Sequence, residues 1–189
     1  MSKFLGLVAA TALATVTAGA AQATNFYAST SGDVVAYFVG STASYDERLG
    51  LLINGVDTGL LGLQNHSSVY GDQLNFGHAD LGDELTFYIL VDTTGDTFYT
   101  DVTLNADAFE HIKFEAFPGF GSVPAGTLVQ FEDIYGGGDQ NFHDEVFVFT
   151  NLTDIKPDVP EPATWAMMVG GFGLVGSAMR RKRTAVSFG

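Results

Sequence analysis

The strongest constraint on the fold comes from residues 84–104, where two apolar segments flank a short polar turn. Residues 97–104 place Phe98, Thr100, Val102 and Leu104 on one face and polar or aromatic residues on the other, the period of a half-buried strand. Residues 84–92 are apolar on both faces, as expected of an inner strand. The intervening Thr-Thr-Gly-Asp is typical of a hairpin turn. The region therefore predicts antiparallel strands.

The same pattern continues along the chain. Residues 33–40 and 145–151 predict two more strands, and Asn54-Gly55 after an apolar run indicates a type I′ turn. Glycine and aspartate separate the remaining segments, and no segment of this region has a convincing helical period. About eight short strands over residues 24–152 predict an all-β fold, an antiparallel β-sandwich for which a jelly roll is one possible form.

The N-terminus has the three parts of a signal peptide. Lys3 precedes an apolar stretch at 4–16, and Ala21-Gln22-Ala23 is an A-x-A cleavage site. We therefore expect residues 1–23 to be removed by signal peptidase, which leaves a mature chain that begins at Thr24 and is exported.

The C-terminus combines a motif, an apolar segment and a basic cluster. Residues 153–162 predict an extended linker that contains Pro160, Glu161 and Pro162. Residues 163–179 carry no charge over 17 positions, and four basic residues follow directly: Arg180, Arg181, Lys182 and Arg183. This order predicts a single-span transmembrane helix over residues 163–183 with its basic end in the cytoplasm. Its shortness and its glycines favour a transient address over a permanent anchor. Residues 184–189 form a tail with no assigned role.

Together these C-terminal features resemble a PEP-CTERM sorting signal, from Val159 through Trp165 to the basic end. The resemblance implies recognition by an exosortase near Pro160, Glu161 and Pro162, in a Gram-negative bacterium that makes exopolysaccharide. It also implies passage through the inner membrane and release to the cell surface or the biofilm matrix.

The charge of the mature region limits its partners. Between Thr24 and Asp158 there are 21 acidic residues against three basic ones, a formal charge of −18. Such a charge argues against nucleic acid or anionic membranes as partners and favours the binding of cations. The chain has no cysteine, which excludes thiol catalysis and cysteine-ligated zinc.

The acidic residues are densest between two predicted strands, at 131–149. Glu132, Asp133, Asp139, Asp144 and Glu145 lie within 14 residues that contain no Lys or Arg. Ca²⁺ suits such a site because it binds 6–8 oxygens, and the three glycines at 136–138 allow backbone carbonyls to turn inward. The predicted ligands are Asp139, Asn141 and Asp144, with Glu132 or Asp133 closing the site. The alternative is an exposed acidic loop that binds no ion.

The stretch also resembles the C-terminal motif of an uncharacterised β-domain of secreted bacterial proteins, through Phe-Glu-Asp, the glycines and D-x-N-F-x-D. Residues 49–77 resemble the N-terminal half of that domain. The resemblance covers most of residues 30–152 and implies no established activity. Calcium binding is its suspected property, and Gln140 replaces an acid that often follows the first Asp.

No motif indicates an enzyme. His66, His78, His111 and His143 have no metal-ligand spacing, and loop or surface positions are expected for them. The preferred interpretation is a non-enzymatic exported protein with a structural calcium site. One alternative is a calcium-dependent carbohydrate-binding or adhesin module, whose ligand would be exopolysaccharide. A second alternative is a glycan hydrolase, because acid pairs are abundant.

Overall fold

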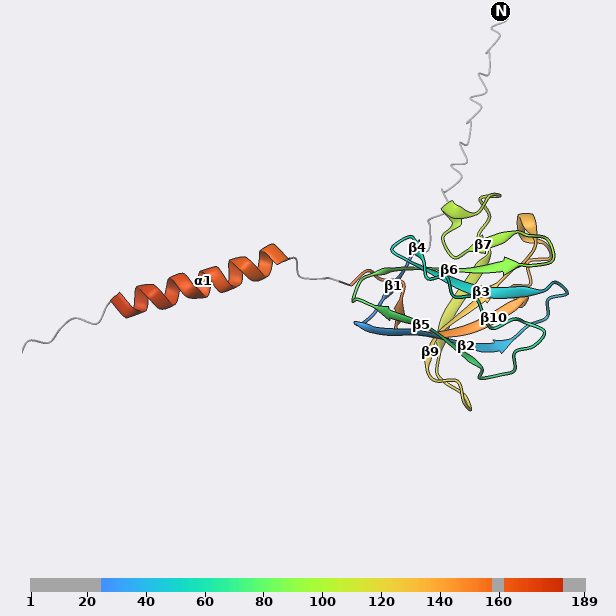
Figure 1. Cartoon of the computed structure of the whole chain (residues 1–189), viewed down its shortest axis with the longest axis horizontal. Helices are drawn as coiled ribbons and strands as arrows, with labels where there is room; N and C mark the ends of the chain where they lie inside the picture. Colours follow the sequence, from blue (N-terminus) through green and yellow to red (C-terminus); the bar gives the residue numbers. More distant parts are fainter. Residues whose placement is uncertain (1–24, 158–161, 182–189) are drawn as a thin grey trace, which may run out of the picture.

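The structure, a computed structural model, describes residues 25–157 and 162–181. The expected signal peptide, Pro160, Glu161, Lys182 and Arg183 lie outside these ranges. Residues 25–157 form two antiparallel sheets that pack face to face (Figure 1). The predicted all-β antiparallel sandwich is therefore confirmed.

The first sheet is built around β6, which pairs with β1, β3 and β7. Its order is β11 (Leu152–Thr153), β1 (Phe26–Ala28), β6 (Glu84–Val91), β3 (Glu47–Ile53) and β4 (Val56–Asp57), with β7 (Thr97–Tyr99) also on β6. The central place of β6 agrees with its predicted role as an inner strand. Because β11 includes Thr153, the sandwich extends one residue past its expected end.

The second sheet has β10 at its centre, between the early strand β2 and the late strand β9. Its order is β5 (Gln73–Ala79), β2 (Gly32–Gly40), β10 (Glu145–Thr150), β9 (Gly126–Phe131) and β8 (Ile112–Phe117). The antiparallel pairing of β9 with β10 holds together the two ends of the acidic segment between them.

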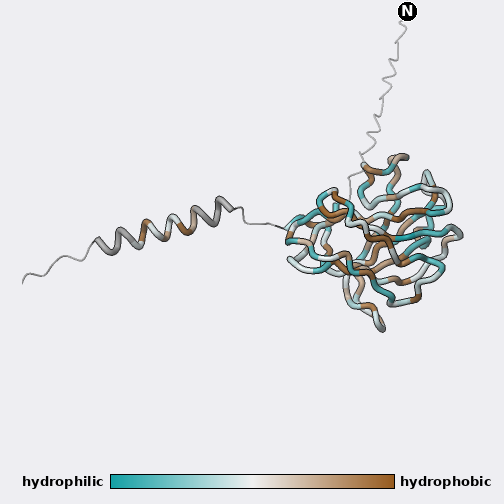
Figure 2. Tube along the Cα trace, viewed as in Figure 1, coloured by the Kyte–Doolittle hydropathy of each residue, from teal (hydrophilic) through white to brown (hydrophobic). Residues whose placement is uncertain are grey.

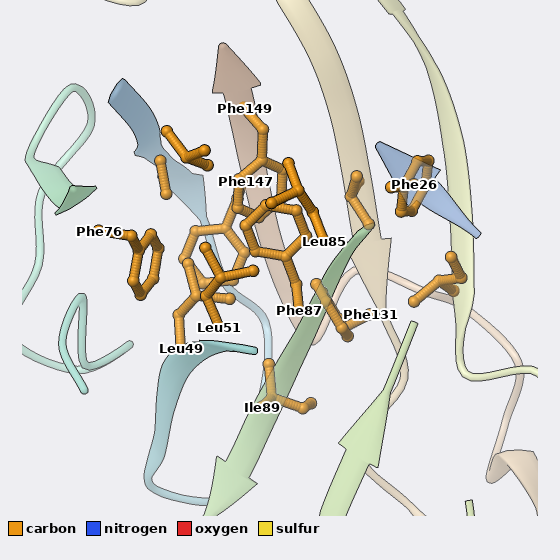
Figure 3. Packing of buried hydrophobic residues seen from close by; sticks show 14 of the residues in the cluster. Phe26, Leu49, Leu51, Phe76, Leu85, Phe87, Ile89, Phe131, Phe147 and Phe149 are labelled. Atoms are coloured by element: carbon orange, nitrogen blue, oxygen red, sulfur yellow. The ribbon is translucent and has the colours of Figure 1, made fainter. Parts of the chain in front are cut away.

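The core lies between the two sheets and is rich in phenylalanine. Phe87 of β6 and Phe149 of β10 have ring centroids 3.9 Å apart, and Phe147 and Leu51 pack beside them (Figure 3). Apolar segments gather in the middle of the sandwich, while many connecting loops are hydrophilic (Figure 2). This burial supplies the main driving force for folding.

Both predicted turns are present. Asn54 and Gly55 have φ of 50° and 76°, the positive values of a type I′ turn, and they join β3 to β4. In the turn between β6 and β7, Gly95 has φ 83° and its N–H donates to the Val91 carbonyl at 2.7 Å.

The predicted strand over residues 97–104 is wrong beyond Tyr99. A 3₁₀ helix, η1, occupies Val102–Leu104, because Asp101 caps it by accepting a hydrogen bond from the Thr103 N–H at 2.9 Å. The Asn105 side chain accepts from the Tyr99 N–H at 2.7 Å. Polar side chains thus take backbone hydrogen bonds that a longer strand would have used.

The C-terminal helix α1 (Pro162–Arg181) is present where a sorting helix was expected. Among the described residues, however, no helix is long and apolar enough to cross a membrane. The expected single-span segment over residues 163–183 is therefore not borne out. Gly170, Gly171, Gly173 and Gly176 dilute the apolar residues of this segment.

Candidate metal site

The acidic residues converge where β9 ends and β10 begins. Glu145 is paired with Phe131 in the β9–β10 ladder, so residues 132–144 form a loop that is closed at its base. A second loop lies against it, because the N–H and the hydroxyl of Thr42 both donate to the His143 carbonyl, at 2.9 and 3.0 Å. The site therefore lies between the β2–β3 and β9–β10 connections.

Three carboxylates form the tightest group. Glu132, Asp133 and Asp144 are all buried, and one ligand oxygen from each lies within 4.8 Å of the other two. The Asp133 N–H donates to Asp144 Oδ2 at 3.3 Å, whereas neither carboxylate oxygen of Glu132 has a hydrogen-bond partner. All three residues were predicted as ligands from the sequence, and the fold brings them together.

Two further buried carboxylates adjoin this group. Glu47 and Glu145 are each 0% exposed, and none of their four carboxylate oxygens has a hydrogen-bond partner. Glu145 was counted in the acidic stretch but not named as a ligand, and Glu47 comes from β3, far away in the sequence. The sequence did indicate that Glu47 is buried, because it stands in phase with the core residues Leu49 and Leu51, but it did not indicate which groups lie beside it.

Burial and mutual repulsion raise the pKa values of these groups. Burial raises the pKa of Glu47 to about 11, and contact with the Asp133 side chain and the charge of Glu145 add to the effect. Burial, with the charge of Asp144, raises the pKa of Glu132 to about 7. Burial and the charge of Asp133 raise the pKa of Asp144 to about 6. The pKa of Glu145 is raised well above its ordinary value, chiefly by burial.

The unpartnered oxygens of Glu47, Glu132 and Glu145 are the clearest sign of a missing positive charge. Ionised carboxylates only accept hydrogen bonds, so buried ones that meet no donor need a proton or a cation. No Lys or Arg is among the groups that shift the pKa values of Glu47, Glu132, Asp144 or Glu145. The cluster is therefore poised for a cation.

Asp139 and Asn141, the other two predicted ligands, are exposed at the rim. They line a pocket of about 320 Å³, together with Thr42, Ser44, Tyr45, Asp133, Ile134 and Asp144. Asp139 Oδ1 accepts from the Asn141 N–H at 3.1 Å, and Asn141 Oδ1 accepts from the His143 N–H at 2.8 Å. The structure thus groups three of the five predicted ligands and leaves two at the mouth.

The glycine turn fits tightly against the site. Gly136, Gly137 and Gly138 all have positive φ, of 74°, 84° and 41°. A Cβ on Gly138 would collide with Oε1 of Glu132, and one on Gly137 would collide with the Phe109 ring. All three glycines are therefore required by conformation, and Gly137 and Gly138 are required by space as well.

Two buried side chains, His111 and Asp107, hold the loop by hydrogen bonds. His111 Nδ1 lies 2.8 Å from the Glu132 carbonyl, and its Nε2 lies 2.9 Å from Asp107 Oδ2. The same Asp107 oxygen accepts from the Gly136 N–H at 2.7 Å. His111 lies in the loop before β8, but it is fully buried and stacks on Phe98, so it is a loop histidine without being a surface one. Glu132 and the glycine turn are thereby fixed together.

Replacing Asp107 with Asn should destabilise the metal-free protein by about 1–3 kcal/mol. Both Asp107 oxygens accept hydrogen bonds, from the Phe109 N–H on one side and from His111 and Gly136 on the other. An amide turned either way would place its NH₂ group against a donor. Thermal denaturation with chelator present measures the effect, and Asp96→Asn at an exposed hairpin position is the control. If D107N and wild type have the same melting temperature in chelator, Asp107 does not stabilise the loop.

Comparison with known proteins identifies only the C-terminal segment. A model of the PEP-CTERM protein-sorting motif matches residues 158–183. No curated protein and no solved structure matches the chain. The resemblance of residues 30–152 to a secreted β-domain, and the signal peptide, stay predictions. The motif implies export, transient membrane anchoring through the sorting signal and processing by an exosortase. The chain thus carries, at residues 158–183, the sorting motif that marks PEP-CTERM proteins.

Proposed function

We propose that the β-sandwich is a calcium-stabilised, non-enzymatic domain that is delivered to the cell surface or the extracellular matrix. The observation that carries the calcium assignment is the group Glu132, Asp133 and Asp144, whose ligand atoms all lie within 4.8 Å of one another in a buried position. Ligands of one Ca²⁺ stand at about 2.3–2.6 Å from the ion, so opposite ligands are about 4.6–5.2 Å apart. The group therefore has dimensions that fit the coordination sphere of one Ca²⁺.

The donor set favours calcium over other common cations. Every candidate ligand is an oxygen, since the described cluster contains carboxylates but no histidine or cysteine, and nitrogen and sulfur are the usual ligands of zinc. Magnesium requires near-ideal octahedral geometry, whereas calcium accepts the irregular arrangement of a loop. Asp139, Asn141 and backbone carbonyls of the glycine turn are available to complete the coordination.

Titration calorimetry of the purified protein, first stripped with chelator, tests the assignment. We expect saturable calcium binding, much weaker magnesium binding, and at least a tenfold loss of calcium affinity in Asp133→Asn. Asp96→Asn changes the same charge at an exposed site and should bind as wild type does. If calcium produces no binding heat at several temperatures, and does not shift the melting curve, the assignment fails.

A carbohydrate-binding role is the second candidate, favoured by the open pocket beside the carboxylates. Thr42 and Ser44 bring hydroxyl groups to this pocket, and Tyr45 brings an aromatic ring. A bound calcium ion at its floor would offer coordination positions to sugar hydroxyls. Glycan binding that disappears with chelator would support this role, whereas turnover of the polysaccharide would indicate the hydrolase instead.

The sorting signal predicts a shortened exported product. We expect the mature protein recovered outside the inner membrane to lack α1 and the basic cluster, because processing falls near Pro160-Glu161-Pro162. Changing these three residues to Ala should retain the chain in the inner membrane. Mass spectrometry of the exported protein checks this, and persistence of the segment through Arg183 would identify a plain anchor.

A further inference from the structure

Within the described ranges, β8 is the edge strand that is both long and regular. It ends the second sheet and pairs with β9 over all six of its residues without a register shift. The other outer strands are short or irregular: β4, β7 and β11 have two or three residues each, and β5 pairs with β2 across a register shift. Proteins usually protect a long edge strand in such ways, because its unpaired backbone groups can pair with another chain.

The backbone of β8 directs alternate hydrogen-bonding groups away from the sheet. The Glu132 N–H donates to the His111 carbonyl at 2.9 Å, so these two residues form a hydrogen-bonded pair of the antiparallel ladder. Such pairs alternate along the ladder, so the backbone groups of Lys113 and Glu115 also face β9. The outward-facing backbone groups, which meet no other described strand, belong to Ile112, Phe114 and Ala116.

The outer face of β8 carries one positive and one negative side chain. Lys113 and Glu115 are both exposed, and they share this face because they are two residues apart on a strand. The ion pairs of the described residues include neither of them. Lys113 Nζ lies 4.0 Å from the centre of the Phe142 ring. Both charges are therefore available to a strand that presents opposite charges beside them.

A second, antiparallel copy of β8 presents the same two charges in reverse order. Hydrogen bonding requires outward-facing residues to lie opposite one another, so the register can change only in steps of two residues. When Phe114 lies opposite Phe114 of the second copy, Lys113 of each copy lies opposite Glu115 of the other. These are non-hydrogen-bonded pairs, in which the side chains approach most closely. The next register on either side places Lys113 opposite Lys113, or Glu115 opposite Glu115.

We propose that two copies of this chain associate through β8, as an antiparallel strand pair centred on Phe114. The contact joins the second sheets of the two copies into one continuous sheet and forms two reciprocal ion pairs. Phe114 is 38% exposed while its ring packs against Phe26, so strand pairing also covers apolar surface. The arrangement is twofold symmetric and self-complementary, which closes the assembly at two copies.

The strength of this contact is limited by its size and by the charge of the protein. A pair of six-residue strands is a small interface, typical of weak association. The formal charge of −18 between Thr24 and Asp158 makes two copies repel one another at long range. Near-physiological salt screens this repulsion beyond about 8 Å, whereas the two ion pairs act at contact. We therefore expect a reversible dimer that forms at high local concentration.

Sedimentation velocity of the purified chain at near-physiological salt tests the interface by exchanging its charges. We expect the wild type to dimerise as its concentration rises. Lys113→Glu alone and Glu115→Lys alone each place like charges opposite one another, so each should weaken dimerisation at least tenfold. The double exchange Lys113→Glu, Glu115→Lys restores opposite charges and should dimerise as the wild type does. Asp96→Lys, the control, changes the net charge as Glu115→Lys does, but at an exposed hairpin position, and should also dimerise.

An equimolar mixture of the two single variants should form mixed dimers, because each variant supplies the charges that the other lacks. Misfolding of a variant cannot produce this recovery. A wild type that stays monomeric throughout would overturn the inference. Dimers that persist in both single variants would assign association to another surface. Loss in the single variants without recovery in the mixture would show that Lys113 and Glu115 do not face each other across the contact.

Discussion

Millimolar calcium should raise the melting temperature of the protein by about 10 °C, and chelator should reverse the change. A cation that binds only the folded state adds about 2.7 kcal/mol at one hundred times its dissociation constant. For a domain of this size each kcal/mol moves the melting temperature by roughly 2–8 °C. Magnesium should have a smaller effect, because it gives up its water reluctantly. Differential scanning calorimetry measures both shifts.

The double variant Asp139→Asn, Asp144→Asn should lose the calcium effect without loss of stability in chelator. Asp144 belongs to the buried group, and the charges of both residues help to raise the pKa of Glu132. Neutral amides relieve that repulsion, and an Asn at position 144 can still accept the hydrogen bond from the Asp133 N–H. If wild type melts identically in calcium and in chelator, the loop binds no calcium.

Without calcium, the protein should be most stable in mild acid and lose stability toward neutral pH. Glu132 has its pKa raised from 4.5 to about 7, Asp144 from 3.8 to about 6, and Glu47 to about 11. Between about pH 5 and 6 the unfolded chain has released these protons while the folded chain keeps them. Stability therefore falls as pH rises, by roughly 1.4 kcal/mol per pH unit for each retained proton. For Glu132 the decline continues to about pH 7.

For carboxylates whose pKa is lowered, stability changes with pH in the opposite direction. Hydrogen bonding to Arg48 lowers the pKa of Asp92. Burial alone would raise the pKa of Asp107, but hydrogen bonds from the Gly136 N–H and from His111 hold it below its ordinary value. Their contribution is present above pH 3.8, the ordinary value, and is lost as pH falls further. The protonation of these groups therefore lowers stability on the acid side of the pH of maximum stability.

Urea denaturation from pH 4 to 8, with and without calcium, measures this profile. Calcium should flatten or invert the decline toward neutral pH, because the metal binds the deprotonated carboxylates. A calcium-free protein that gains stability from pH 5 to pH 7 would show that the carboxylates are already neutralised by another partner.

Local patterns predicted the strands and turns because the signal lay within a few residues. The alternation at 33–40 and the Asn54-Gly55 pair each specify backbone geometry directly. The strand over residues 97–104 had the same alternation, but the side chains of Asp101 and Asn105 captured its backbone groups. Alternation alone does not reveal such local competition.

The candidate site was only partly predictable because the buried carboxylates around it come from both sheets. Glu132, Asp133 and Asp144 share one loop, so their density in the sequence was informative. Glu47 is brought to them by the packing of β3 against the second sheet, a long-range contact that no local pattern encodes. The burial of His111 behind the loop depends in the same way on its stacking against Phe98 of β7.

The most direct test of the calcium site is the anomalous diffraction of crystals grown in millimolar calcium near neutral pH. The account predicts a peak within about 2.3–2.6 Å of an oxygen from each of Glu132, Asp133 and Asp144. If such crystals show only ordered water between these three carboxyl groups, the account is contradicted.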